Sequence, residues 1–217
     1  MGMVFEDRDE AGKRLAAALP QFRERPDTVL LGLARGGIPV AAAAANVLHL
    51  PFGAVLVRKL GIPGHDETAF GALAYSGGRI VRLLNRPLVA RILENGVRQA
   101  WLDEVESRER EELLRRVEKY PGINQEVRGK TALLVDDGLA TGATMRAAVE
   151  AVRSSGAASV VAAAPVGSIE AEKSLSRVCD VLCLHLPGKF RAVGSFYRHF
   201  DQLTDDDAIG LLRGAQP

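Results

Sequence analysis

Two adjacent aspartates, Asp136 and Asp137, follow the apolar run 131–135 and precede the small residues of 138–144. Two carboxylates at the end of a buried strand repel one another, so positive charge is needed beside them. Small residues at the start of a helix leave the backbone N–H groups open to a bound anion. This order of residues indicates a site that places positive charge beside the acids and a phosphate monoester on the loop.

A second small-residue turn contains Arg35, Gly36 and Gly37 and follows a strand predicted over 28–34. Its arginine supplies a guanidinium, which can grip a diphosphate through paired hydrogen bonds. Ligands of parallel α/β sheets bind beyond the carboxyl ends of the strands, so both turns are expected at one edge. Two common phosphate motifs are absent, because no lysine lies in 138–145 and no G-x-G-x-x-G follows the first strand.

Apolar runs alternate with helical patterns along the chain, which predicts an α/β fold with a parallel sheet covered by helices on both faces. The predicted strands are 28–34, 51–60, two strands around Gly77 and Gly78 within 68–84, 130–137, 158–166 and 180–186. The predicted helices are 9–22 with Asp9 as N-cap, 38–49, 86–119, 141–156, 168–178 and a last one that begins with a capping box of Thr204 and Asp207. Residues 61–67 are predicted to form a loop.

Charge and composition narrow the function classes. The net charge of +1 gives no electrostatic case for a nucleic-acid or membrane partner. Cys179 and Cys183 imply no disulfide framework, and with His185 they fit no usual zinc spacing, so we expect them to pack in the core. The charged start lacks the apolar core of a signal peptide, and we expect a cytoplasmic protein.

The stretch LLVDDGLATGAT (133–144) resembles the signature of the type I phosphoribosyltransferases, which bind 5-phosphoribosyl-1-diphosphate (PRPP). LARGGIPVA (33–41) resembles the diphosphate loop of that family, and VRKLG (57–61) resembles its basic pair before a mobile loop. The resemblance covers about 28–185 in order and is closer to a predicted, poorly characterised group than to the purine or pyrimidine salvage enzymes. Gly138 departs from the signature, because most members carry a branched apolar residue there.

The resemblance implies a role for each residue that matches the motifs. Asp136 and Asp137 would accept hydrogen bonds from the ribose hydroxyls, favour a cationic C1 and help to hold Mg²⁺, directly or through water. The 5-phosphate would be bound by Ala140, Thr141, Gly142, Ala143 and Thr144. The diphosphate would be bound by Arg35, Gly36, Gly37, Arg58 and Lys59. For Arg58 and Lys59, a solvated strand end is an equally good interpretation.

Two further segments carry expectations with open alternatives. Residues 61–72 would form a flexible lid with His65 and Glu67, which serve either as a general base or, more simply, as surface-loop residues. Phe196 and Tyr197 would stack on the acceptor in a hood, or else pack in the core or a dimer interface.

The leading hypothesis is a single phosphoribosyltransferase-like domain over 1–217, with a core at about 28–185 and a small hood from about 1–25 and 186–217. With Mg²⁺ as cofactor, it would move the 5-phosphoribosyl group from PRPP to a nitrogen nucleophile, a nucleobase or related heterocycle, and release diphosphate. The alternatives are a non-catalytic regulator that binds PRPP or a nucleotide, and a different phosphoribosyl chemistry such as hydrolysis. The resemblance also implies a homodimer.

Overall fold

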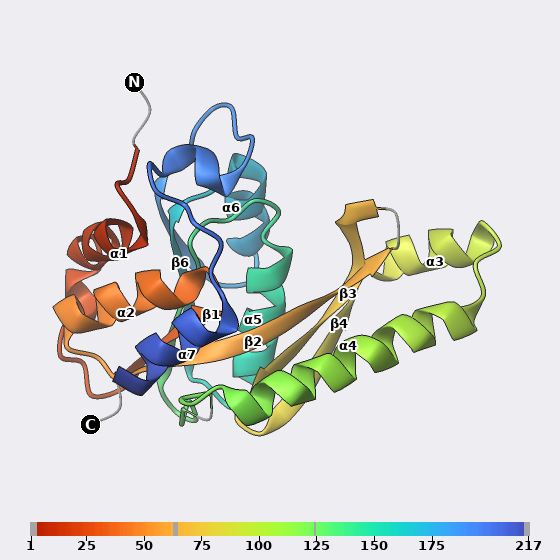
Figure 1. Ribbon diagram of the computed structural model, residues 1–217, viewed down its shortest axis with the longest axis horizontal. Coiled ribbons are helices and arrows are strands. Elements are labelled where there is room, and N and C mark those ends of the chain that lie inside the picture. The colour runs from red at the N-terminus through yellow and green to blue at the C-terminus, as the bar shows by residue number, and fades with distance from the viewer. Residues whose placement is uncertain (1–3, 63–64, 124, 215–217) are drawn as a thin grey trace.

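The computed structural model describes residues 4–62, 65–123 and 125–214, and of residues 65–68 it describes the backbone only. Its centre is a seven-stranded sheet with the order β4-β3-β2-β1-β5-β6-β7 (Figure 1). The strands are β1 (Thr28–Leu33), β2 (Phe52–Ile62), β3 (His65–Ser76), β4 (Arg79–Leu84), β5 (Thr131–Val135), β6 (Ser159–Val166) and β7 (Asp180–His185).

The predicted parallel sheet is confirmed by five of these strands, and the two strands predicted around Gly77 and Gly78 form an antiparallel hairpin at its side. β2, β1, β5, β6 and β7 pair in parallel, whereas β3 pairs antiparallel with both β2 and β4. The turn between β3 and β4 contains Gly77 and Gly78, whose φ angles of 55° and 78° suit glycine. The α/β class predicted from the sequence therefore holds, with an antiparallel extension on one side.

Helices cover both faces of the sheet, as Figure 1 shows. The helices are α1 (Arg8–Ala17), α2 (Gly37–Leu48), α3 (Arg86–Glu94), α4 (Gln99–Lys119), α5 (Ala143–Ser154), α6 (Ile169–Leu175) and α7 (Asp205–Gly214), with short 3-10 turns at Pro20–Phe22 and Val193–Phe196. Alternate residues of β1 explain the two layers: Leu30 packs in the core with α1, α2, α4 and α7, and Leu31 packs in the core with α5 and α6.

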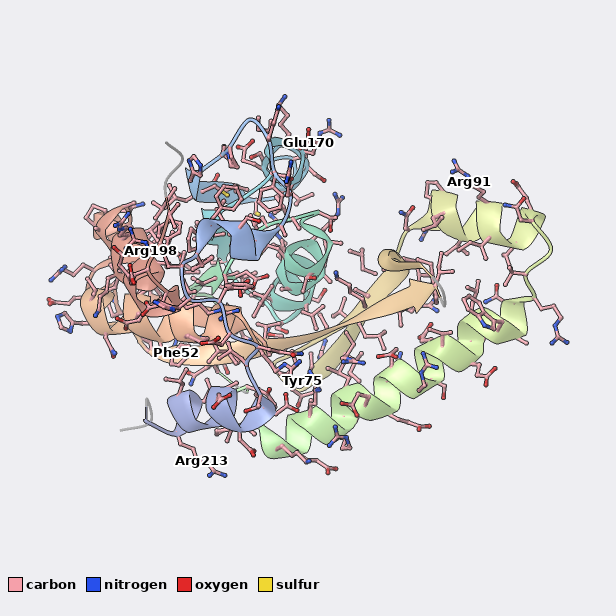
Figure 2. All side chains as sticks on the ribbon, turned by 45° about the horizontal axis from the view of Figure 1, so that its top comes forward. Phe52, Tyr75, Arg91, Glu170, Arg198 and Arg213 are labelled. Carbon is pink, nitrogen blue, oxygen red and sulfur yellow. The ribbon has the colours of Figure 1, made fainter. Side chains whose placement is uncertain are left out.

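Strands β2, β3 and β4 extend beyond the main sheet and carry α3 and α4, and Arg91 lies at the far end of this arm (Figure 2). The sequence predicted one helical segment over 86–119. The structure shows two helices instead, because Gly96 between them adopts a φ of 86° that a helix cannot contain. α4 buries Leu102, Val105 and Leu113 against the arm and leaves its charged face to solvent.

The loop predicted over 61–67 is wrong within the described residues. β2 continues to Ile62 and β3 begins at His65, with Ile62 paired to His65 and Gly61 to Ala69. The glycines and proline of this stretch indicated a loop, but the cross-strand pairing of the arm keeps its flanks extended. Residues 63–64 and the side chains of His65 and Glu67 lie outside the described part, so their predicted lid roles stay predictions.

The segment before α1 lies beside the 3-10 turn Val193–Phe196, because the N–H of Phe5 donates to the carbonyl of Phe196 at 2.8 Å. Asp7, rather than the predicted Asp9, caps α1, because its Oδ1 accepts the N–H of Glu10 at 2.9 Å. The capping box of α7 is confirmed by reciprocal bonds of 2.9 and 3.2 Å between Thr204 and Asp207. Among the residues with described positions, no helix is both long and apolar enough to cross a membrane.

Candidate functional site

The phosphate loop, residues 140–144, joins the end of β5 to the start of α5. Gly142 stands before the first helical residue with a φ of 73°, a conformation that favours glycine. Ser168, which is buried, donates from Oγ to the carbonyl of Ala140 at 2.7 Å, and Leu139 pairs with Gly167. These bonds to the segment after β6 hold the loop open at the start of α5, where helix N–H groups are free to bind an anion.

One residue of the diacid faces this loop directly. A cavity of about 190 Å³ is lined by Asp136, by Lys59 from β2 and by the phosphate loop, including Thr141, Gly142 and Thr144. The predicted acid, cation and loop therefore lie around one space, although β2 and β5 are far apart in the sequence. Backbone N–H groups, two hydroxyls and an ammonium make this space suitable for a phosphate ester.

The turn with Arg35, Gly36 and Gly37 touches the diacid. A Cβ atom on Gly36 would lie 2.1 Å from Oδ2 of Asp137, and one on Gly37 would lie 2.4 Å from the carbonyl oxygen of Val135. Any other residue would push the two loops apart. The glycines predicted to approach a diphosphate thus also allow the first turn to pack against the acids.

The predicted cations gather beside this turn. Arg35, Arg58, Lys59 and Thr144 line a second cavity of about 650 Å³. Arg58 donates from Nε to Glu109 of α4 at 2.8 Å, so it is not simply a solvated strand end. Its neighbour Lys59 is exposed and has no hydrogen-bond or ion-pair partner among the described residues.

Asp137 has a partner that the sequence did not predict. Arg8, the first residue of α1, donates from Nε to Oδ2 of Asp137 at 2.9 Å, with 11% and 14% of the two side chains exposed. The Arg8 guanidinium also lies 3.9 Å from the ring centre of Phe200 and donates to the carbonyl of Asp201 at 3.0 Å. The N-terminal helix and the C-terminal segment thus meet at the second acid.

The two acids differ in their electrostatic surroundings. Burial, followed by the charge of Asp137, raises the pKa of Asp136 well above the ordinary aspartate value, despite the backbone N–H of Asp137 and the charges of Lys59 and Arg8. Burial also raises the pKa of Asp137, and the charge and hydrogen bond of Arg8 oppose that rise. A positive group brought next to Asp136 would therefore be strongly favoured.

Gly138, the departure from the signature, has a structural reason. A Cβ atom there would lie 2.5 Å from Cγ1 of Val193, which belongs to the 3-10 turn after β7. The branched side chain that the signature expects at 138 is replaced by one that arrives from the C-terminal segment. Gly138 therefore reflects the packing of this segment onto the diacid.

The proposed acceptor residues lie in that C-terminal segment. Tyr197 is only 6% exposed, packs against Phe5 and Phe200, and donates from its hydroxyl to the carbonyl of Asp137 at 2.6 Å. Phe196 stacks on Phe190 with ring centres 5.6 Å apart. Phe190 in turn lines a cavity of about 650 Å³ that includes Ala140 and Thr141 of the phosphate loop.

Sequence reasoning missed three side chains at this site: Arg8 on Asp137, Glu109 on Arg58, and Asp205, whose Oδ1 lies 3.9 Å from Arg35. Each belongs to a helix distant in sequence from the residue that it contacts. Because charged residues are common on helix surfaces, their presence in the sequence does not indicate such a contact. Cys179, Cys183 and His185, by contrast, pack as expected against the apolar core or an aromatic ring.

Comparisons with known proteins identify the family of this chain. Two curated relatives from Mycobacterium tuberculosis, each named "Putative phosphoribosyl transferase", are 40% identical over 212 residues, which is 96% of this chain and 46% of each relative. The chain thus spans about half the length of these relatives. The crystal structure of TT1426 from Thermus thermophilus is 39% identical with a TM-score of 0.81, over 99% of this chain and 100% of that one.

The family model described as "Phosphoribosyl transferase domain" matches residues 8–192. This range contains β1 to β7, both small-residue turns, the diacid and Arg8. The resemblance and the fold class predicted from the sequence are confirmed together, and the chain belongs to the phosphoribosyl transferase domain family.

Proposed function

We propose that this chain transfers the 5-phosphoribosyl group of PRPP to a nitrogen nucleophile, a nucleobase or related heterocycle, with release of diphosphate. The observation that carries the proposal is the placement of Asp136, Lys59 and the phosphate loop around one cavity, next to the turn with Arg35. In the proposed reaction the C1–O bond to diphosphate breaks, diphosphate leaves with the electron pair, the nitrogen lone pair forms the new C1–N bond, and the N–H proton of the acceptor is released to water.

The residues of the site would each favour this transfer. The phosphate loop would hold the 5-phosphate on its N–H groups, and Thr141 and Thr144 would add hydroxyl donors. Arg35, Arg58 and Lys59 would hold the diphosphate, so that charge developing on the leaving group meets fixed positive groups. Asp136 would face the ribose and the cationic C1, and its pKa, raised by burial, is consistent with a position that favours positive charge.

The site also fits Mg²⁺. Mg²⁺ prefers oxygen ligands and is usually bound by one or two carboxylates together with substrate phosphates. Asp136 supplies such a carboxylate beside the proposed diphosphate position, while the described residues contain no cluster of three His, Cys, Asp or Glu that could cage the ion alone. When bound, Mg²⁺ would neutralise the diphosphate as it leaves.

Several further expectations belong to this proposal. Residues 61–72, with His65 and Glu67, would close as a lid and exclude water. The segments 1–25 and 186–217 would form a hood over a core of 28–185 in one domain. Phe196 would support an acceptor beside Phe190. Tyr197, which is buried, would position Asp137 through its hydrogen bond to the carbonyl of that residue. A cytoplasmic homodimer is the expected assembly.

The test is release of diphosphate from PRPP and Mg²⁺ with a panel of purine and pyrimidine bases and related heterocycles. We expect release that depends on one acceptor and is lost in Asp136→Asn. Free ribose 5-phosphate without an acceptor would identify hydrolysis instead. Activity that Asp136→Asn and Asp137→Asn both leave unchanged would contradict the assigned site.

A second candidate is a regulator that binds PRPP or a nucleotide without transfer. One observation favours it: Arg8 already pairs with Asp137, so one of the two acids has its charge matched before any ligand arrives. Calorimetry that shows PRPP binding, combined with no turnover for any acceptor, would support the regulator over the transferase.

A further inference from the structure

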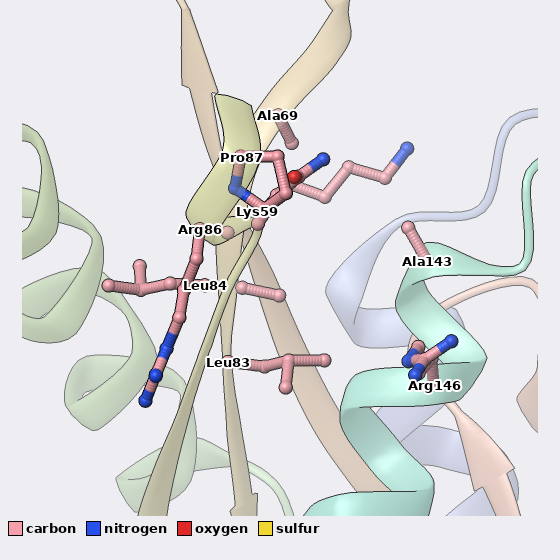
Figure 3. A pocket seen from close by; sticks show the side chains of 11 residues that line it. Lys59, Ala69, Leu83, Leu84, Arg86, Pro87, Ala143 and Arg146 are labelled. Atoms are coloured by element: carbon pink, nitrogen blue, oxygen red, sulfur yellow. The ribbon is translucent and has the colours of Figure 1, made fainter. Parts of the chain in front are cut away.

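A further cavity of about 490 Å³, called the arm cavity below, lies between the arm and the first turns of α5 (Figure 3). Its walls include Ala72 of β3, Leu83 of β4 and Arg146 of α5. Lys59 lines both this cavity and the one that contains Asp136, so the two spaces share one cation. Of the phosphate loop, Ala143 lines the arm cavity, whereas Ala140, Thr141, Gly142 and Thr144 line the cavity of Asp136, so the two spaces adjoin without coinciding.

The charges of this cavity are positive and unmatched. Lys59, Arg86 and Arg146 line it, and none of its described lining residues is acidic. In the described part of the chain, none of these three side chains has an ion pair or hydrogen bond, although Arg58 and Arg82 of the same arm pair with Glu109 and Glu106. Like charges gathered around a low-dielectric wall attract an anion.

The wall of the cavity is apolar. Ala72, Leu83 and Pro87 contribute to it, and the side chain of Leu83 points toward α5 in Figure 3. Lys59 and Arg146 lie on that same side, whereas Arg86 is directed away from Arg146. A cavity of this size, largely apolar with a few charged groups, suits a small organic ligand.

We propose that this cavity binds a nucleoside monophosphate, with the phosphate between Lys59 and Arg146 and the base against Leu83. Two cations match the charge of a phosphate monoester, and the apolar wall matches the flat face of a base. The proposal does not depend on transfer activity, because it concerns binding at a space that takes only Ala143 from the phosphate loop.

Because both cavities contain Lys59, a ligand bound at this site would affect binding in the cavity of Asp136. A nucleotide phosphate would occupy Lys59 and add negative charge beside the Asp136 cavity. Binding of an anion there would therefore be weakened, and by linkage the anion would weaken nucleotide binding by the same factor. The arm cavity would therefore be an inhibitory site, because a nucleotide bound there would weaken binding in the cavity of Asp136.

The test is calorimetry with AMP, GMP and UMP, and with ribose 5-phosphate as the probe of the phosphate loop. Arg146→Ala should weaken binding of the preferred nucleotide about tenfold, the usual order of effect for one charged hydrogen bond, and leave ribose 5-phosphate binding within about twofold. Arg91→Ala is the matched control, since Arg91 is unpaired within the described residues and lies at the far end of the arm (Figure 2). It should change neither affinity.

Three results would overturn the proposal. One is the absence of binding by all three nucleotides. Another is nucleotide binding that Arg146→Ala leaves unchanged and ribose 5-phosphate displaces at a single site. The third is inorganic phosphate binding as tightly as the nucleotides, which would mean that the apolar wall contributes nothing. Arg146→Gln, with circular dichroism of both variants, separates loss of the site from loss of folding.

Discussion

Asp136 and Asp137 are neighbours in the sequence but belong to different parts of the molecule. Asp136 faces the phosphate loop, which follows it within a few residues of chain. Asp137 faces Arg8 from one end of the chain, and its carbonyl accepts the hydroxyl of Tyr197 near the other end. One acid is thus placed to meet a ligand, and the other ties the ligand site to the packed termini.

The charges around the two acids follow the same division. Burial raises the pKa of both, but only Asp137 has a guanidinium in direct contact to oppose the rise. For Asp136 the compensation comes first from the N–H of Asp137, which donates to its Oδ1 at 2.9 Å, and then from the more distant charges of Lys59 and Arg8. Asp136 lines the cavity without an ion pair among the described residues, whereas Asp137 lies behind it and pairs with Arg8. We therefore expect Asp136 to contribute mainly to ligand binding and Asp137 mainly to stability.

The largest expected effect is on the proposed transfer. Asp136→Asn keeps the shape of the side chain but removes the charge that faces the cavity, and we expect the rate of diphosphate release to fall about 10²–10³-fold. Asp137→Asn should lower this rate less, because the carboxylate of Asp137 binds Arg8 and affects the reaction only by positioning the loop. Measured kcat and KM for the two variants test this order. Equal losses in kcat would break the comparison between the acids.

The next effect is on stability. Arg8→Ala and Asp137→Asn should each lower the free energy of unfolding by about 1–3 kcal/mol, because each leaves a mostly buried charged partner without its ion pair. The double variant should cost less than the sum, and urea unfolding of the four proteins gives the coupling energy. Arg198→Ala is the control.

Arg198 also pairs with an acid near the N-terminus, Glu6, but 69% of its side chain is exposed. Its removal should change the stability by less than about 1 kcal/mol. A coupling energy near zero between Arg8 and Asp137 would show that the contact contributes nothing to the packing of the termini.

The same division explains what the sequence could predict. The phosphate loop, Asp136 and the Arg35 turn are recognisable because strand, small residues and helix follow one another along the chain. Arg8 is separated from Asp137 by 129 positions, and a charged residue at the start of a helix is too common to indicate such a contact. The order of residues along the chain therefore predicted the cavity around Asp136, whereas the contact between Arg8 and Asp137 depends on tertiary packing.

The errors in the fold have the same origin. Residues 61–67 are rich in loop-forming types, yet pairing between β2 and β3 keeps the described residues on both sides extended. The helical pattern of 86–119 continues through Gly96, and only the return of α4 along the arm requires a break there. Gly138 was visible as a departure, but its cause, Val193, comes from a distant segment.

Gly138→Val tests the packing of that segment next to the acids. The new side chain would overlap Val193, whose Cγ1 would lie 2.5 Å from the added Cβ, and overpacking of this kind costs about 1–3 kcal/mol. Val193→Ala in the same chain should restore part of the loss. Gly188→Ala is the control, since nothing lies within 4 Å of a Cβ there. Thermal unfolding should show a clear drop in Tm for Gly138→Val and none for the control, and an unchanged Tm in both would contradict close packing at Gly138.

The smallest expected effect is the pH dependence of stability that arises from Asp136. The pKa of Asp136 is raised in the folded state, so the folded protein binds more protons than the unfolded one between the ordinary value of 3.8 and the raised value. The favourable contribution of Asp136 is therefore full below that ordinary value and is lost as the pH rises through the raised one.

At pH 7 the buried charge of Asp136 is a cost that Asp136→Asn removes, so this variant should have a higher Tm than the parent protein without ligand. The difference should shrink as the pH falls through the raised pKa and should vanish below about 4, where the aspartate of the unfolded chain is protonated as well. Asp137→Asn also removes a buried charge whose pKa is raised, but it leaves Arg8 without its partner, and we expect this second effect to be larger and the Tm at pH 7 to be lower. A lower Tm for Asp136→Asn at pH 7 would mean that its carboxylate has its charge matched within the fold, and the distinction between the two acids would then fail.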